Sequence, residues 1–171
     1  MIETYRFFIP GDAIPKQGDK SHLMKNKAGG AFIHHYQPKK IVNEVKSIKT
    51  FIYSQLPTGF QLIDTPFVYS LMFIFTPLRG MPKYALEDIR MGKLLIKDTK
   101  PDLDNLEKMV MDAAEGLVFT NDSRAYRCVD KAKAYGSKPG IFFKVETNRV
   151  DVKYDYINLR LPWLLSEFGV Y

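Results

Sequence analysis

An apolar run between two prolines, PFVYSLMFIFT at positions 66–76, limits most what this chain can fold into. The run is rich in aromatic and β-branched residues and has turn-forming residues at both ends, which is typical of a buried strand. It is far shorter than the roughly 20 residues that a membrane-spanning helix needs. Of the 171 residues, 46% are hydrophobic, which is ample for a core and excludes a disordered chain. We therefore expect this strand to be the centre of one folded domain.

Two other segments have the periodicity of amphipathic helices. Apolar residues from Ile41 to Leu56 recur every three or four positions, and this segment lies between Pro38 and Pro57. A second helix is predicted from about residue 104 to Glu115, because the same spacing recurs there and Gly116 follows at the position of a helix cap.

Further strands are predicted on both sides of these helices. Residues 5–10 form a strand that ends at a Pro-Gly turn, and a short strand begins at residues 118–119. Residues 124–135 alternate between a basic and an apolar face, and residues 141–145 complete a hairpin with them across Lys138-Pro139-Gly140. The order strand, helix, strand, helix, hairpin predicts a small α/β or α+β domain with a mixed sheet flanked by helices.

Three segments have no clear place in that domain. Residues 14–30 are rich in Lys and Gly without hydrophobic periodicity, and we expect a mobile loop there. Residues 77–99 are predicted to be an insertion or flexible arm, and residues 147–171 a C-terminal extension that covers apolar surface. We expect residues 1–171 to form a single domain that includes both.

The charge of the chain changes sign along its length. The net charge is +6, which alone indicates only that polyanionic partners are favoured. Residues 1–50 carry +5 and residues 77–100 carry +3, whereas residues 101–122 carry −5, with one Lys against six Asp and Glu; residues 123–149 return to +5. An acidic segment between basic ones suits a metal-dependent enzyme acting on a phosphodiester, and it also suits a solvated helix whose acids balance nearby bases.

The segment KPDLDNLEK at 100–108 carries the most chemical information. Pro101 favours an extended entry, so Asp102 and Asp104 project to the same side and are placed to share a hard cation such as Mg²⁺. Lys108 follows Asp104 by one helical turn, where it can neutralise a scissile phosphate. A chain reversal after the helix can bring Asp122 beside them, which gives three carboxylates and predicts metal-activated hydrolysis of a phosphodiester.

Simpler roles exist for each of these residues. Asp104 suits a helix N-cap that pairs with Glu107, Asp102 suits the helix dipole, and Asp122 suits a turn. We expect the later helix acids, Asp112 and Glu115, to be solvated.

The remaining polar candidates carry little signal. His34 and His35 are expected to be incidental surface residues, although they could contact phosphate or a base. Cys128 is expected in the core on the apolar face of its strand. One cysteine and three histidines make an intramolecular disulfide impossible and a zinc site unexpected, and the acid near the N-terminus is unlike a signal peptide, so we expect a cytoplasmic protein that does not enter membranes.

With these residues in view, the sequence resembles the RusA family of Holliday junction resolvases, small endonucleases common in bacteria and their prophages. The resemblance rests on KPDLDNLEKMVMDAAEG (100–116), VFTNDSRAY (118–126) and KAYGSKPGIFFKVE (133–146), with weaker similarity at FFIPGDAIPKQ (7–17) and FIHHYQPKKIVNEVKSI (32–48). It covers most of residues 5–146.

The resemblance implies an endodeoxyribonuclease that resolves four-way DNA junctions by paired nicks during recombination and repair. It implies that Asp102, Asp104 and Asp122 bind Mg²⁺, with Mn²⁺ as a substitute, that Lys108 is the essential lysine, and that no nucleotide cofactor is used. It also implies a homodimer, whose two-fold symmetry suits a two-fold junction. Basic residues outside the acidic segment are then expected to contact the DNA backbone: Lys16, Lys20, Lys25, Lys39, Lys40, Lys100, Arg127, Lys131 and Lys133.

Two other function classes stay open at the level of sequence. The first is a junction-binding protein of the same fold without catalysis, in which Asp102 and Asp104 are structural. The second is a globular interaction domain whose basic charge is incidental.

Overall fold

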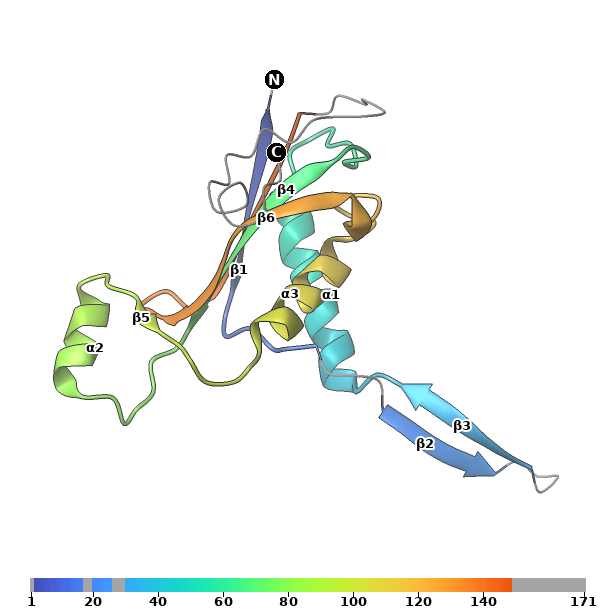
Figure 1. The fold of residues 1–171 in the computed structure, drawn as a ribbon, viewed down its shortest axis with the longest axis horizontal. Helices are drawn as coiled ribbons and strands as arrows, with labels where there is room; N and C mark the ends of the chain where they lie inside the picture. The colour runs from blue at the N-terminus through green and yellow to red at the C-terminus, as the bar shows by residue number, and fades with distance from the viewer. Residues whose placement is uncertain (1, 17–19, 26–29, 149–171) are drawn as a thin grey trace, which may run out of the picture.

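A five-stranded mixed sheet in the order β1-β7-β4-β6-β5 forms the centre of the protein, with helices α1 and α3 side by side on one face of it (Figure 1). The computed structural model describes residues 2–16, 20–25 and 30–148. The elements that build the sheet and cover it are β1 (Glu3–Pro10), α1 (Lys39–Gln55), β4 (Phe67–Phe75), β5 (Leu95–Ile96), α3 (Leu103–Ala114), β6 (Ala125–Tyr135) and β7 (Gly140–Thr147). The predicted α+β fold with a mixed sheet is confirmed.

The apolar run at 66–76 forms β4, the central strand. Phe67, Leu71 and Phe73 are at most 1% exposed and face the helices. Phe67 also stacks on Phe119 with ring centroids 4.6 Å apart. Phe119 forms only isolated bridges, to Ile63 and Glu115, so the short strand predicted at 118–119 is not a regular one.

The predicted hairpin between residues 124–135 and 141–145 is wrong. β6 and β7 both pair with β4, β6 in parallel and β7 antiparallel, so β4 lies between them. β7 then pairs with β1 on its other side. The physical reason is burial: β4, the most apolar strand, takes the central position, whereas the basic β6 lies nearer the edge.

Both predicted helices are present and bury the expected side chains. Ile41, Ile48 and Ile52 of α1 and Leu106 and Val110 of α3 are at most 2% exposed. α3 is followed by Gly116 with φ of +72°, a left-handed conformation that glycine adopts without steric cost. None of the helices in the described part of the chain is both long and apolar enough to cross a membrane.

The mobile loop predicted at 14–30 is wrong in part, because it contains a strand. β2 (Lys20–Lys25) pairs antiparallel with β3 (Ala31–Tyr36), and the two form a separate arm that projects from the body (Figure 1). The strand was missed because the described side chains on both faces of this arm are exposed, so the Lys-rich sequence shows no apolar alternation.

Residues 77–99 also have structure of their own. They contain α2 (Lys83–Arg90) and the two-residue strand β5, which pairs with the end of β6. The lobe carrying α2 and the β2–β3 arm project on opposite sides of the start of α3 (Figure 1). Residues 149–171, most of the predicted C-terminal extension, lie outside the described residues.

Candidate active site at the start of helix α3

Two lysines hold the segment that leads into α3. The ammonium of Lys133, on β6, donates to the carbonyl oxygens of Thr99 and Pro101, each at 2.7 Å. Lys97 is 8% exposed and donates to the Thr99 hydroxyl at 2.9 Å and to the Tyr135 hydroxyl at 3.1 Å. The approach to Asp102 is therefore fixed to the sheet by charge-assisted hydrogen bonds.

The surroundings of Lys97 are aromatic. Its Nζ lies 5.1 Å from the ring centroid of Phe75 and 4.9 Å from that of Tyr135, where the ring faces attract a cation. Hydrogen bonds with Thr99 and Lys97 lower the pKa of the Tyr135 phenol below its ordinary value. This buried lysine was missed from sequence, because its partners come from three separate strands and loops.

Asp102, Asp104 and Lys108 are exposed at the N-terminal end of α3. Asp102 is the N-cap residue, but its side chain makes no capping hydrogen bond, so the predicted capping by Asp104 and Glu107 is not the arrangement found. Lys108 Nζ lies 3.2 Å from Asp104 Oδ2, the expected spacing of one helical turn. The hydrogen bond from Lys108 lowers the pKa of Asp104, which keeps that carboxyl ionised.

A basic groove lies beside Asp102. This α3 groove has a volume of about 620 Å³ and is lined by residues 13–16, Lys40, residues 100–102 and Asn105. Three lysines, Lys16, Lys40 and Lys100, thus share one concave surface with the Asp102 carboxylate. Positive charge around a single exposed carboxylate suits a polyanion that must approach it.

The structure keeps Asp122 away from the other two aspartates of its own chain. Lys131 pairs with Glu107 and Lys133 with Pro101, so β6 runs antiparallel to α3. Asp122 begins the short helix η1 (Asp122–Arg124) just before β6, beyond the C-terminal end of α3 (Figure 1). Within residues 2–16, 20–25 and 30–148, no group of three or more His, Cys, Asp or Glu side chains is placed to hold a metal ion.

The residues at the start of α3 nevertheless fit Mg²⁺. This ion binds hard oxygen ligands, uses one or two carboxylates, and completes its shell with water and substrate phosphate. Asp102 and Asp104 supply two exposed carboxylates two residues apart, and the Asp102 carboxylate is not used for capping. Asp102 and Asp104 are therefore the two residues of one chain that would hold the ion.

Eight of the nine predicted DNA-binding residues fall into two groups. Lys25, Lys39, Lys40, Lys100 and Arg127 are exposed. In contrast, Lys16 pairs with Asp112, Lys131 pairs with Glu107 at 2.6 Å, and Lys133 is held by the two carbonyls described above. Lys20 lies on β2 opposite Tyr36. Their contacts with DNA stay a prediction.

A cluster under α3 was missed from sequence. Glu107 accepts hydrogen bonds from Tyr69 and Lys131, and only 17% of its side chain is exposed. Burial, followed by the bond to Glu107, raises the pKa of Tyr69, which therefore stays a donor. One signal for this cluster was present in the sequence. Glu107 lies on the inner side of the start of the helix, whereas Asp102 and Asp104 are exposed.

The expectation that Cys128 is a core residue on an apolar face is wrong. Opposite β4, Tyr126 and Val129 are each an extra residue, and each slip in register turns the following side chains to the other face. Cys128 is half-buried and shares the α3 side with Lys131. Burial, together with the Glu107 carboxylate, raises the pKa of its thiol. The slip at Val129 places Arg127 on the opposite face of β6 from Lys131 and Lys133. The predicted alternation had placed all three on one basic face.

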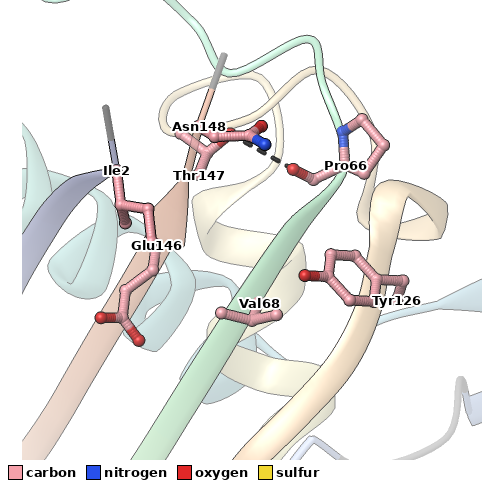
Figure 2. Close-up of a pocket in the computed structure, with 7 residues that line it drawn as sticks. All are labelled: Ile2, Pro66, Val68, Tyr126, Glu146, Thr147 and Asn148. Atoms are coloured by element: carbon pink, nitrogen blue, oxygen red, sulfur yellow. Dashed lines mark hydrogen bonds between the residues drawn. The ribbon is translucent and has the colours of Figure 1, made fainter. Parts of the chain in front are cut away.

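A second hollow lies at the far end of the sheet from the α3 groove. Figure 2 shows Tyr126 beside Val68 and Glu146 on β7, and the cavity of about 190 Å³ is closed by Ile2, Pro66, Thr147 and Asn148. Its carboxylate, Glu146, pairs with Lys144 at 2.9 Å. Although this hollow is the more enclosed of the two, it offers a single paired acid, whereas the α3 groove combines an exposed carboxylate with three lysines.

The later acids of α3 and the two histidines named above can also be placed in the structure. Asp112 is half-exposed and paired with Lys16, and Glu115 follows the last turn of α3. His34 and His35 lie on β3.

Comparison with protein families finds a match over most of the chain. The family model described as endodeoxyribonuclease RusA matches residues 12–146, which include the β2–β3 arm, the α3 groove, Asp104, Lys108 and Asp122. No curated protein matches the chain significantly.

Proposed function

Because the chain belongs to the RusA family of endodeoxyribonucleases, we propose that it resolves Holliday junctions by cutting two opposing strands during recombination and repair. The observation that carries this proposal is the α3 groove, in which Lys40 and Lys100 lie beside Asp102. DNA carries one phosphate charge per about 1.7 Å of duplex axis, so a backbone drawn to these lysines passes over the carboxylate.

We assign the binding of Mg²⁺, or of Mn²⁺ in its place, to Asp102 and Asp104. When bound, the ion lowers the pKa of a coordinated water and stabilises charge on the phosphate. Lys108 partly neutralises Asp104 and is exposed, so it can turn to the scissile phosphate when DNA arrives. Lys133 and Lys97 act one step further away, since they position the backbone that carries Asp102.

The proposed active protein is a homodimer. The third family carboxylate, Asp122, lies at the wrong end of α3 to join Asp102 in the same chain, so we propose that a second copy supplies it. A two-fold arrangement then forms two equal sites, which suits two cuts in a two-fold junction. The sheet offers surface for such pairing, because Val68, Met72 and Phe142 are only half-buried on the face opposite α1 and α3.

Cleavage of a synthetic four-way junction tests the function. The unmodified chain and Asp102→Asn are compared, each with Mg²⁺ and with a chelator. We expect paired nicks from the unmodified chain with Mg²⁺ alone. We expect Asp102→Asn to nick at least about 100-fold more slowly while binding the junction equally or more tightly, since one negative charge beside DNA is removed.

Asp88→Asn is the matched control, because Asp88 lies on α2 and pairs with Lys93 at 2.8 Å. It should cut normally. Full cleavage by Asp102→Asn would remove the assignment of Asp102.

A second candidate function is a junction-binding protein without catalysis. It is favoured by one observation, that the described part of a single chain holds no group of three potential metal ligands. The same experiment separates the two, because this protein would retard the junction without cutting it under any metal condition.

A further inference from the structure

Among the described residues, the two strands of the β2–β3 arm pair only with each other, and none of the arm's described side chains belongs to the buried core. The arm projects away from the sheet and from α1 (Figure 1). A two-stranded hairpin is at best marginally stable alone in water. An element of this kind is expected to find its stabilising contacts in a partner.

Large apolar side chains cover both faces of the arm. Met24 and Phe32 are directly opposite each other and are 42% and 49% exposed, and Leu23 and Ile33 are opposite each other and both 61% exposed. Successive residues of a strand point to opposite faces, so the two pairs lie on different faces. We call the face with Met24, Phe32 and Tyr36 the aromatic face, and the face with Leu23 and Ile33 the aliphatic face.

The arm is also strongly basic. Residues 16–40 carry six lysines and one acid, Asp19, which gives +5. Two copies of such a segment repel each other, so a second copy of the arm is a poor partner for it. A polyanion that offers flat apolar surface is a good one.

The root of the arm adjoins the α3 groove. Lys16 precedes β2, Lys40 follows β3, and both line the groove with Asp102. The Lys16 amide also donates to the Asn105 carbonyl of α3 at 2.9 Å. Each strand of six residues extends about 20 Å, which is enough to reach across DNA that lies in the groove.

We propose that the arm recognises the branch point of DNA by stacking the aromatic face, chiefly Phe32, on base faces that are not covered by a neighbouring base pair there. This inference rests on the proposed function. In duplex DNA the base faces are covered by stacking, and an apolar ring meets only phosphates and groove edges. At a branch point the faces are accessible, and aromatic rings stack on them without regard to sequence. The arm therefore selects branched DNA over duplex, while the lysines at its root supply affinity for both.

Binding of a four-way junction and of a duplex of the same sequence tests this, with Asp104→Asn as the parent so that nothing is cut. We expect Phe32→Ala to weaken junction binding about tenfold and to leave duplex binding unchanged, and Phe32→Trp to retain junction binding. Ile33→Ala, on the aliphatic face of the same strand, is the matched control and should bind both DNAs as the parent does. The fluorescence of a 2-aminopurine base at the branch point should change when the parent binds and should stay unchanged when Phe32→Ala binds.

The inference is overturned by three results. The first is an equal loss for junction and duplex, which would make the effect electrostatic or structural. The second is a similar loss in Ile33→Ala, which would mean that only the integrity of the arm matters. The third is a change in mass of Phe32→Ala in sedimentation, which would make a second copy the partner of the arm. Failure of the nuclease proposal is a separate result, since it appears as absence of Mg²⁺-dependent nicking by the unmodified chain.

Discussion

The ammonium of Lys133 lies 2.7 Å from the carbonyl oxygen of Pro101, the residue directly before Asp102. The same ammonium bonds the Thr99 carbonyl at 2.7 Å, and Lys97 bonds the Thr99 side chain. A side chain that sequence analysis assigns to the DNA backbone is thus used inside the protein. Its effect on cleavage should come from the position of Asp102 and not from DNA affinity.

Lys133→Met should therefore slow nicking of bound junction by about 10- to 100-fold, because a displacement of about 1 Å at a reacting group has an effect of that order. Junction affinity and its dependence on salt should stay unchanged. Single-turnover nicking at saturating protein and binding across a salt series measure the two quantities separately.

Arg127→Met is the matched comparison on the same strand, since Arg127 is exposed. If Arg127 contacts a phosphate, its loss lowers the slope of log affinity against log salt by about one and leaves single-turnover nicking intact. A lowered salt slope in Lys133→Met would contradict the positioning role.

The cluster beneath α3 should contribute to stability. Glu107→Ala removes the acceptor of Tyr69 and leaves the Lys131 ammonium, 29% exposed, without its partner. We expect unfolding free energy to fall by about 1–3 kcal/mol in urea denaturation. Glu87→Ala, on the exposed side of α2, should change it by less than about 0.5 kcal/mol. An equally small change in Glu107→Ala would show that the cluster is not stabilising.

The elements predicted well from sequence are those with strong apolar patterns. β4, α1 and α3 each follow a run or a 3.6-residue spacing that local physics fixes. The β2–β3 arm was missed because its described side chains are exposed on both faces. Its sequence therefore lacks the alternation of apolar and polar residues that predicts a half-buried strand. The β6–β7 hairpin was predicted because the two strands are joined by a turn, whereas their true neighbour, β4, lies about 60 residues earlier in the sequence.

The candidate site shows the same division. Asp104 and Lys108 lie together as the helical spacing predicts. Long-range strand pairing and two register slips in β6 determine the surroundings of three other residues, Lys97, Glu107 and Cys128. No local sequence pattern encodes these features. The distance of Asp122 from Asp102 follows from the direction of β6 relative to α3, which a sequence alone leaves open.

Cys128, the single cysteine of the chain, reports on this region chemically. Burial and the Glu107 carboxylate raise its pKa, so at pH 8 it should hold less thiolate than an ordinary thiol of pKa about 8.5 and react more slowly with a disulfide reagent. The pKa of Cys128 is higher in the folded protein than in the unfolded chain. The contribution of this thiol to stability is therefore fully present at a pH below the unfolded-state pKa, and it is lost as the pH rises through the folded-state pKa.

Glu107→Gln should speed the reaction of Cys128, since it removes a negative charge that opposes the thiolate. The pH profile of the reaction rate gives the pKa in both proteins, and the urea-unfolded chain supplies the reference. A pKa of Cys128 in the folded protein that is equal to or lower than its pKa in the unfolded chain would contradict the described burial.

Mixing of inactive chains tests whether the site is shared between two copies. In a heterodimer of Asp102→Asn with Asp122→Asn, a shared site pairs both changes in one centre and leaves the other centre intact. We therefore expect nicking of one strand, at about half the wild-type rate per dimer, from two chains that are each inactive alone. Co-expression with two different affinity tags, followed by a denaturing gel of junction labelled on each strand in turn, gives this result directly.

Asp102→Asn mixed with Asp104→Asn is the control, because both residues belong to the same end of α3. Every centre of that heterodimer carries one change, whichever chain supplies Asp122, so it should stay inactive. Activity in the first mixture and not in the second requires Asp102 and Asp122 to act across the dimer. Inactivity of both mixtures, with Asp122→Asn inactive alone, would instead mean that the chain rearranges to bring Asp122 to its own Asp102, against the direction of β6 described above.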